Sequence, residues 1–329
     1  MSRRLPALPL AAALLVLLAA LAIALGTEPV SLSEALARPG LARTIVVEVR
    51  LPRVLLAAMA GLGLGVVGAA FQALLRNPLA EPYVLGVSGG AALGATTAIA
   101  LGLGTTTVLG AALIPAASLA GGLLATTLVY GVARGLRGGA SGTSILLAGV
   151  MVNSIAAALI TFLKALVPPS RAQQLLRWLV GFVDLPHKPA LVAAAIYVGI
   201  GCAVLLADAG RLNLLALGDE TAETLGVDAR ALERRVFFAS SCIIGAIVSL
   251  TGLIGFVGLV VPHAVRRIIG PDQRRVLPVS MICGAAMLVG CDLIARLAFR
   301  SLGTEPPVGA VTALIGGPAF LVMLKRSQG

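Results

Sequence analysis

Long apolar windows that contain no charged residue follow one another along almost the whole chain, and short polar segments separate them. Eight such windows occur, at residues 5–27, 54–75, 82–133, 138–163, 189–207, 236–265, 276–291 and 306–324. A helix needs about 20 apolar residues to cross the hydrocarbon core of a bilayer. The pattern therefore predicts helices that span a lipid bilayer, with polar connections between them.

Two of these windows are long enough for more than one helix. Residues 82–133 include a Gly/Thr-rich break near 101–107, and we expect two spans there. Residues 236–265 are broken around 251–255, which predicts one ordinary and one short span. With one helix in each other window, the prediction is an all-α polytopic membrane protein of about ten transmembrane helices, in a single domain covering residues 1–329. The first window is interpreted as a retained span, because no small-x-small cleavage site leads into a soluble domain.

Charge supports this class and predicts an orientation. Only 12% of the residues are charged and the mean hydropathy is +1.01, whereas soluble domains carry about twice that charge. With the N-terminus inside and an even number of spans, 15 of the 25 Lys and Arg residues fall in cytoplasmic segments. We therefore expect both termini to be cytoplasmic. The ten bases on the outer face suggest an acidic partner there.

The sequence lacks the motifs that several kinds of binding site require. The chain has no G-x-x-x-x-G-K-[ST] phosphate loop, its two histidines have no metal-ligand spacing, and no metal, other cofactor or nucleic acid is expected. Residues 63–68 satisfy G-x-G-x-x-G, but they lie inside an apolar window. Gly61 and Gly65 are spaced to let two helices approach closely, and we favour that interpretation over nucleotide binding. Asp292, the one acid deep in a predicted span, precedes Arg296 by four residues, which favours a structural ion pair.

One long polar segment, residues 208–235, holds six of the chain's 14 acids. Within it, Gly218 interrupts the chain, Asp219 can cap a helix, residues 220–225 can form under two turns, and Gly226 can end them. Ala222 and Leu225 are expected on one face of this helix. A helix so short is marginal alone, so the segment is either a solvated loop or a docking helix that a partner holds.

The polar stretch RNPLAEP at residues 76–82, which we name the RNPLAEP loop, lies between two apolar windows. Its two prolines prevent a regular helix from continuing. Non-helical backbone at membrane depth is tolerated where it lines a cavity or is buried in protein. The loop is therefore either a turn between two spans or part of a transport path.

Seven motifs occur in an order that resembles one family. They are RLPR (50–53), RNPLAEP (76–82), LGVSGGAALGA (85–95), LLAGV (146–150), LGDETAETLGV (217–227), GFVGLVVPHAVRR (255–267) and PVGAVTALIGGPAFL (307–321). Over nearly its whole length the chain resembles FecCD-type permeases, the membrane subunits of type II ABC importers. The resemblance implies a BtuC-like fold in the inner (cytoplasmic) membrane and a homodimer. It also implies two separate ABC ATPase subunits inside and a periplasmic or surface substrate-binding protein outside.

The resemblance also assigns roles to residues. The cytoplasmic gate is expected at Asn77, Leu79, Thr143 and Ser144. Contact with the ATPase is expected at Leu217, Gly218, Asp219, Glu220, Ala222, Leu225 and Gly226, within residues 208–235, which we name the coupling segment. Docking of the binding protein is expected at Arg50 and Arg53, with Arg296 a weaker match. Arginine suits such contacts because it can bind a carboxylate with two hydrogen bonds.

The expected function is ATP-driven import of a metal chelate by alternating access, with no catalysis by this chain. Iron–siderophore is the first choice because it is the commonest cargo in the family, and cobalamin and haem are the alternatives. Around Val180, Phe182 and Val183 the chain departs from the small residues of close relatives, so the resemblance does not identify the cargo. A secondary carrier driven by an ion gradient is the alternative from another class, although such carriers usually have more intramembrane acids.

Overall fold

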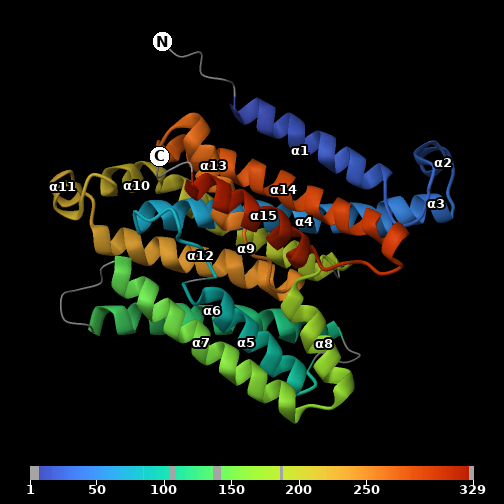
Figure 1. Cartoon of the computed structure of the whole chain (residues 1–329), viewed down its shortest axis with the longest axis horizontal. Helices are drawn as coiled ribbons and strands as arrows, with labels where there is room; N and C mark the ends of the chain where they lie inside the picture. Colours follow the sequence, from blue (N-terminus) through green and yellow to red (C-terminus); the bar gives the residue numbers. More distant parts are fainter. Residues whose placement is uncertain (1–6, 84, 104–107, 136–141, 186–187, 326–329) are drawn as a thin grey trace.

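The computed structural model describes residues 7–83, 85–103, 108–135, 142–185 and 188–325, and every regular element within these ranges is a helix (Figure 1). In chain order the helices are α1 (Ala7–Ala24), α2 (Leu32–Ala37), α3 (Leu41–Thr44), η1 (Ile45–Arg50), α4 (Leu51–Leu74), α5 (Val87–Ala100), α6 (Val108–Gly135), α7 (Gly142–Leu166), α8 (Pro169–Val180), α9 (Lys188–Ala207), α10 (Ala209–Leu215), α11 (Asp219–Thr224), α12 (Ala229–Thr251), α13 (Val257–Ile269), α14 (Gln273–Leu302) and α15 (Val308–Lys325).

Each of the ten predicted spans contains one helix, namely α1, α4, α5, α6, α7, α9, α12, α13, α14 and α15. In the described part of the chain, seven helical stretches are long and apolar enough to cross a membrane, and α5 and α15 are shorter apolar helices. The tenth, α13, has 13 residues. Both predicted breaks are confirmed, because α5 ends before residue 101 and α12 ends at Thr251. The all-α polytopic class is confirmed as well.

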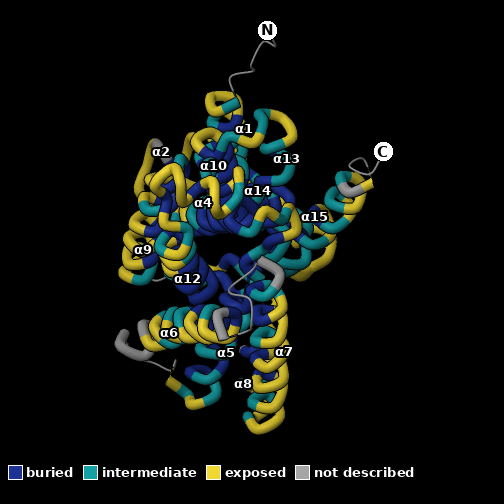
Figure 2. The backbone as a smooth tube through the Cα atoms, turned by 90° about the vertical axis from the view of Figure 1, so that its left-hand side faces the viewer, coloured by how far each residue is buried: buried dark blue, intermediate teal, exposed yellow. Residues whose placement is uncertain are grey.

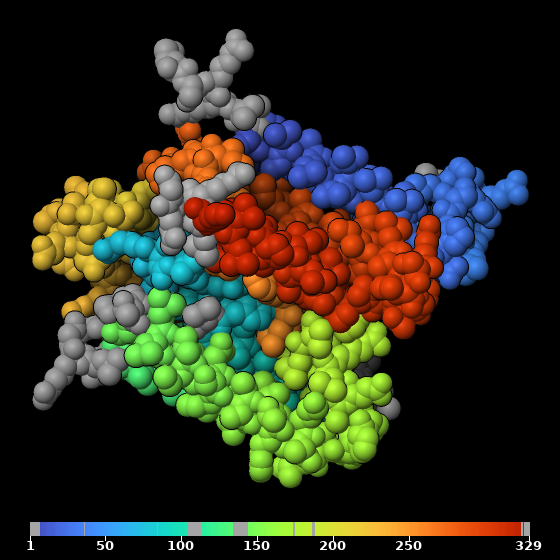
Figure 3. Space-filling view, viewed as in Figure 1, coloured from blue at the N-terminus to red at the C-terminus, as the bar shows by residue number. Residues whose placement is uncertain are grey.

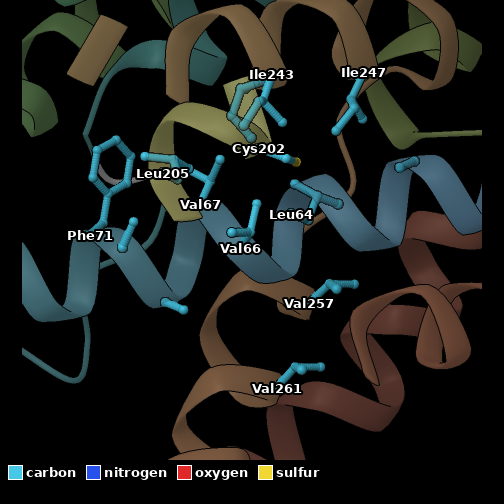
Figure 4. Close-up of a cluster of buried hydrophobic side chains, with 14 of the residues drawn as sticks. Leu64, Val66, Val67, Phe71, Cys202, Leu205, Ile243, Ile247, Val257 and Val261 are labelled. Atoms are coloured by element: carbon cyan, nitrogen blue, oxygen red, sulfur yellow. The ribbon is translucent and has the colours of Figure 1, made fainter. Parts of the chain in front are cut away.

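Helix α4 forms the centre of the packed core. It runs between α14, α13, α12 and α9, and Figure 2 shows burial concentrated around it. Figure 4 shows how α4 is enclosed: near Leu64, side chains of α12 such as Ile243 and Ile247 lie on one side, and Val257 and Val261 of α13 lie on the other. Helix α1, by contrast, has only 11% of its residues buried and lies at the periphery. A helix that is apolar all round and so exposed is suited to face lipid.

Glycines let α4 approach its neighbours closely. A Cβ atom on Gly61 would overlap the carbonyl oxygen of Gly284 in α14, and one on Gly65 would overlap that of Ser280. On another face, a Cβ atom on Gly68 would overlap the carbonyl oxygen of Gly258 in α13. The glycine motif within residues 61–68 therefore packs helices together, as its spacing predicts.

The two ends of the molecule carry different short elements. Figure 1 places α10 and α11 at one end of the long axis and α2 and α3 at the opposite end. The N-terminal end of α1 and the C-terminal end of α15 both point toward the α10–α11 end. The RNPLAEP loop follows the end of α4 that faces in the same direction, which places it near the coupling segment.

Candidate gate and coupling site

The RNPLAEP loop is a compact turn with its own hydrogen bonds. The Asn77 side-chain oxygen accepts a hydrogen bond from the Leu79 N–H at 2.9 Å, and its carbonyl oxygen accepts one from the Ala80 N–H at 3.1 Å. Asparagine is suited to such turns because its side chain can replace a backbone acceptor. The turn leaves Leu79 44% exposed while Ala80 is buried. It therefore presents one large apolar side chain at the surface.

The C-terminal end of the loop is fixed to two other helices. The half-buried Glu81 carboxylate accepts a hydrogen bond from the Phe256 N–H at 2.9 Å, immediately before α13 begins. A carboxylate is favourable at this position because a helix N-terminus carries partial positive charge. The Asn153 side chain of α7 donates a hydrogen bond to the Tyr83 carbonyl oxygen. The loop is thus held between α13 and α7.

The second pair of expected gate residues opens α7. Ser144 is half-buried in the first turn of this helix, and the side chain of Thr143 lies outside the described part of the structure. The hydrogen bond that fixes the loop's flank to α7 is made at Asn153, nine residues beyond Ser144. Asn153 was not identified from the sequence, because its acceptor is a backbone carbonyl of a distant segment.

The coupling segment contains the short helix that its glycines predict. Gly218 has φ +115° and directly precedes α11, and Gly226 has φ +84° shortly after α11 ends. Both are left-handed conformations that favour glycine. The expected N-cap is corrected: Gly218 occupies that position, and Asp219 is the first residue of the helix. The Asp219 carboxylate instead forms an ion pair with Arg76 of the RNPLAEP loop.

The faces of α11 also differ from the prediction. Ala222 is fully buried, whereas Leu225 is 55% exposed, so the two residues do not share a face. Leu225 lies just past the last residue of the helix, where the helical period no longer applies. Leu217, which precedes α11 in the sequence, is 64% exposed, and Glu220 is exposed as well. The outer surface therefore combines two leucines with acids, at the end that projects in Figure 3.

The arginines expected at the docking face contact the chain itself. Arg50 is buried and donates hydrogen bonds to the carbonyl oxygens of Ile23 (2.9 Å), Ala24 (2.8 Å) and Glu28 (2.6 Å). Arg296, also buried, donates to the carbonyl oxygens of Ala22 (2.9 Å) and Leu25 (3.3 Å). Basic side chains commonly bind the free carbonyls at a helix C-terminus in this way. Arg50 and Arg296 therefore hold the end of α1.

Arg53 belongs to a neighbouring charge network. Its guanidinium lies 2.9 Å from the Asp292 carboxylate and also forms an ion pair with Glu305. Arg296 lies 2.9 Å from the other oxygen of Asp292, which confirms the predicted i,i+4 pair. The Arg53 side chain is 14% exposed and is the only one of the three expected docking arginines that is not fully enclosed.

Comparisons with known proteins agree with this architecture. The model of the FecCD transport family matches residues 14–326. The chain is 42% identical over 291 residues to the cobalamin import system permease protein BtuC of Halobacterium salinarum, covering 88% of this chain and 76% of that protein. It is 37% identical over 284 residues to the hemin transport system permease protein HmuU of Yersinia pestis, covering 86% of this chain and 84% of that protein.

The fold is also that of a solved transporter. The inward-facing structure of a transporter assigned to the metal-chelate type of ABC transporters superposes with a TM-score of 0.85 and 28% sequence identity, covering 97% of this chain and 98% of that chain. The family match, the relatives and the fold all point to the same kind of protein. The chain belongs to the FecCD transport family, whose members are membrane permease subunits of ABC importers, and it is a transport subunit, not an enzyme.

Proposed function

We propose that this chain is the permease through which an ATP-driven importer moves a metal chelate into the cell. The observation that carries the proposal is the agreement over 97% of the chain with a transporter of the metal-chelate type. The arrangement of the short elements supports it, because the RNPLAEP loop and the coupling segment lie together at one end. ATP hydrolysis belongs to the separate partner subunits.

The proposed assembly has two copies of this chain around a central path. An ABC ATPase subunit binds each coupling segment, and a substrate-binding protein docks at the opposite end, where α2 and α3 lie (Figure 1). Both termini are then cytoplasmic, because the free ends of α1 and α15 point toward the coupling segment. A reporter that is active only outside the cell membrane, fused after Gly329, should stay silent; strong activity there would contradict this orientation.

The proposed gate consists of Asn77, Leu79, Thr143 and Ser144. Leu79 supports this role, because an apolar side chain at the tip of a turn gains from contact with its twin in a second copy. Leu79→Cys should cross-link across the dimer axis when the gate is closed. If Leu79→Cys failed to cross-link in every nucleotide state of an assembled complex, the gate role would be wrong.

Among the three expected docking arginines, we propose a direct contact with the binding protein only for Arg53, which retains some exposure and lies beside Glu305. Arg50 and Arg296 support the docking face indirectly, since they fix the end of α1 and the chain that leaves it. Arg53→Glu should slow association of the binding protein at low salt. Unchanged association would exclude Arg53 from the interface.

For the cargo, sequence similarity supports cobalamin first and haem second, since the relatives named for these cargoes are 42% and 37% identical. A ferric siderophore, the commonest cargo of the family, is the third candidate. The complex with its ATPase and binding protein should be reconstituted in proteoliposomes and offered cyanocobalamin, haemin and ferrichrome in turn. We expect uptake of one chelate that requires ATP. Uptake driven by an ion gradient without ATP would instead indicate a secondary carrier and overturn the proposal.

A further inference from the structure

We propose that the ion pair between Arg76 and Asp219 transmits the position of the coupling segment to the RNPLAEP loop and so sets the position of Leu79. The inference rests on the proposed gate and coupling roles and names the residues that connect them. Arg76 and Asp219 act as positioning residues, since neither needs to touch the cargo.

The connection is direct although the two residues are far apart in sequence. Asp219 is the first residue of α11, and Arg76 is the first residue of the loop, 143 positions earlier. Helix α11 is anchored to the rest of the chain on its inner side by the fully buried Ala222. The ion pair adds a contact on another side, from the first turn of α11 to the loop. A displacement of α11 by a partner subunit therefore acts directly on Arg76.

Two residues in sparsely populated backbone conformations lie where the loop is attached to the rest of the chain. In the described part of the chain, Arg76 (φ +49°) and Phe256 (φ +69°) are the only non-glycine residues with positive φ. Residues held in such sparsely populated conformations cluster at switch segments. Arg76 begins the loop, and near its other end the Phe256 N–H donates a hydrogen bond to the Glu81 carboxylate. The loop thus begins at a residue in an unusual backbone conformation, and its other end is hydrogen-bonded to a second such residue in a neighbouring segment.

The ion pair is strong enough to bias the loop and too weak to lock it. Both side chains are exposed, and exposed pairs change an equilibrium constant by about 1.5- to 5-fold. A contact can shift a two-state equilibrium only through a difference in its strength between the two states. A pair that forms in one position of α11 and breaks in the other supplies such a difference, and salt should weaken it.

A labelling experiment on the full complex tests this connection. Leu79→Cys is introduced after the four native cysteines are replaced, and the complex with its ATPase is placed in proteoliposomes with the ATPase outside. The rate of labelling by a membrane-impermeant maleimide is measured with and without ATP and Mg²⁺. We expect ATP to change the rate in this parent. Arg76→Glu and Asp219→Lys should each reduce the response about 1.5- to 5-fold, and the combined charge reversal should restore it.

Two controls separate the connection from general effects of charge. Arg267→Glu reverses an exposed arginine of α13 that lies outside the loop and the coupling segment and makes no ion pair with any residue that the structure describes, and its response should match the parent. Arg76→Lys keeps the positive charge and should keep most of the response. If the Asp219→Lys variant loses the ATPase during purification, the labelling response of Arg76→Glu alone tests the connection. Arg76 belongs to the loop and not to the coupling segment, so we expect this variant to keep its ATPase.

The outcomes distinguish this inference from the proposed function. If the parent responds to ATP and Arg76→Glu responds equally, the connection is wrong while the gate role stands. If the charge reversal fails to restore a response lost in the single variants, the pair does not act through its charge, and the inference is again overturned. If the parent hydrolyses ATP without any change in labelling at position 79, the gate role itself fails, and the inference fails with it.

Discussion

Asp292 should be the carboxylate on which the outer half of the bundle depends most. It is fully buried in α14, and its two oxygens each lie 2.9 Å from a guanidinium, one from Arg53 and one from Arg296. Arg296 in turn binds the last carbonyls of α1. Asp292→Asn keeps the size of the side chain and removes only its charge. We expect this change to destabilise the contacts among α1, α4 and α14.

The expected loss of unfolding free energy depends on the contacts that Arg53 and Arg296 keep in the Asp292→Asn variant. Removing one member of a buried ion pair costs roughly 3–5 kcal/mol, because the remaining charge is uncompensated. Arg53 keeps Glu305 and partial contact with water, so most of the loss falls on the enclosed Arg296. The asparagine oxygen still accepts a hydrogen bond. We therefore expect the lower end of the range, about 3 kcal/mol.

Glu305→Gln is the matched control. Glu305 binds the same Arg53 but is 25% exposed, so water can replace its charge. Its loss should cost less than about 1 kcal/mol. The free energy of unfolding can be measured for both variants by SDS titration in mixed micelles, followed by circular dichroism. Equal effects of the two substitutions would refute the reasoning, because burial would then not determine the cost of removing the carboxylate.

Three further predictions concern packing, backbone and pH. Gly61→Ala should destabilise the α4–α14 contact by about 1–3 kcal/mol in the same titration, whereas Gly131→Ala, which has open space, should not destabilise. Gly218→Val places a β-branched residue at φ +115°; we expect weaker co-purification of the ATPase from a chain that still inserts. The Asn213 amide, with the Arg274 N–H and nearby arginines, lowers the pKa of Asp272 in the α13–α14 connection below its ordinary value. Asp272 therefore stabilises the fold above about pH 4, and the stability lost in Asp272→Ala, measured by thermal unfolding, should shrink as the pH falls below that.

The helical spans could be predicted from the sequence because a bilayer imposes a simple rule. Backbone groups in lipid must be satisfied internally, so each charge-free window of sufficient length becomes a helix. The short α13 was predictable only from the break at residues 251–255. The Gly61/Gly65 contact and the Asp292–Arg296 pair were predictable as well, because both depend on spacing within a single helix.

Contacts with backbone acceptors could not be predicted. The resemblance places Arg50 and Arg296 on a docking face, but the structure directs both to the carbonyls at the end of α1. Every residue has a carbonyl oxygen, so the sequence contains no mark of which carbonyls lack a partner. The pair between Arg76 and Asp219 was hidden for a related reason, since its members are brought together only by the packing of distant helices.

The wrong prediction for the face of α11 leads to a statement about the partner. A helix of six residues offers one buried position, Ala222, and the chain turns away before Leu225 can repeat it. Leu225 and Leu217 therefore stay exposed on either side of the exposed Glu220. Two isolated leucines are ordinary on a surface, but at the tip of a segment with this many acids they combine apolar contact with negative charge. In the proposed assembly, we therefore expect the ATPase surface that receives α11 to be an apolar groove with basic residues at its rim, since such a surface covers both leucines and pairs with the Glu220 carboxylate.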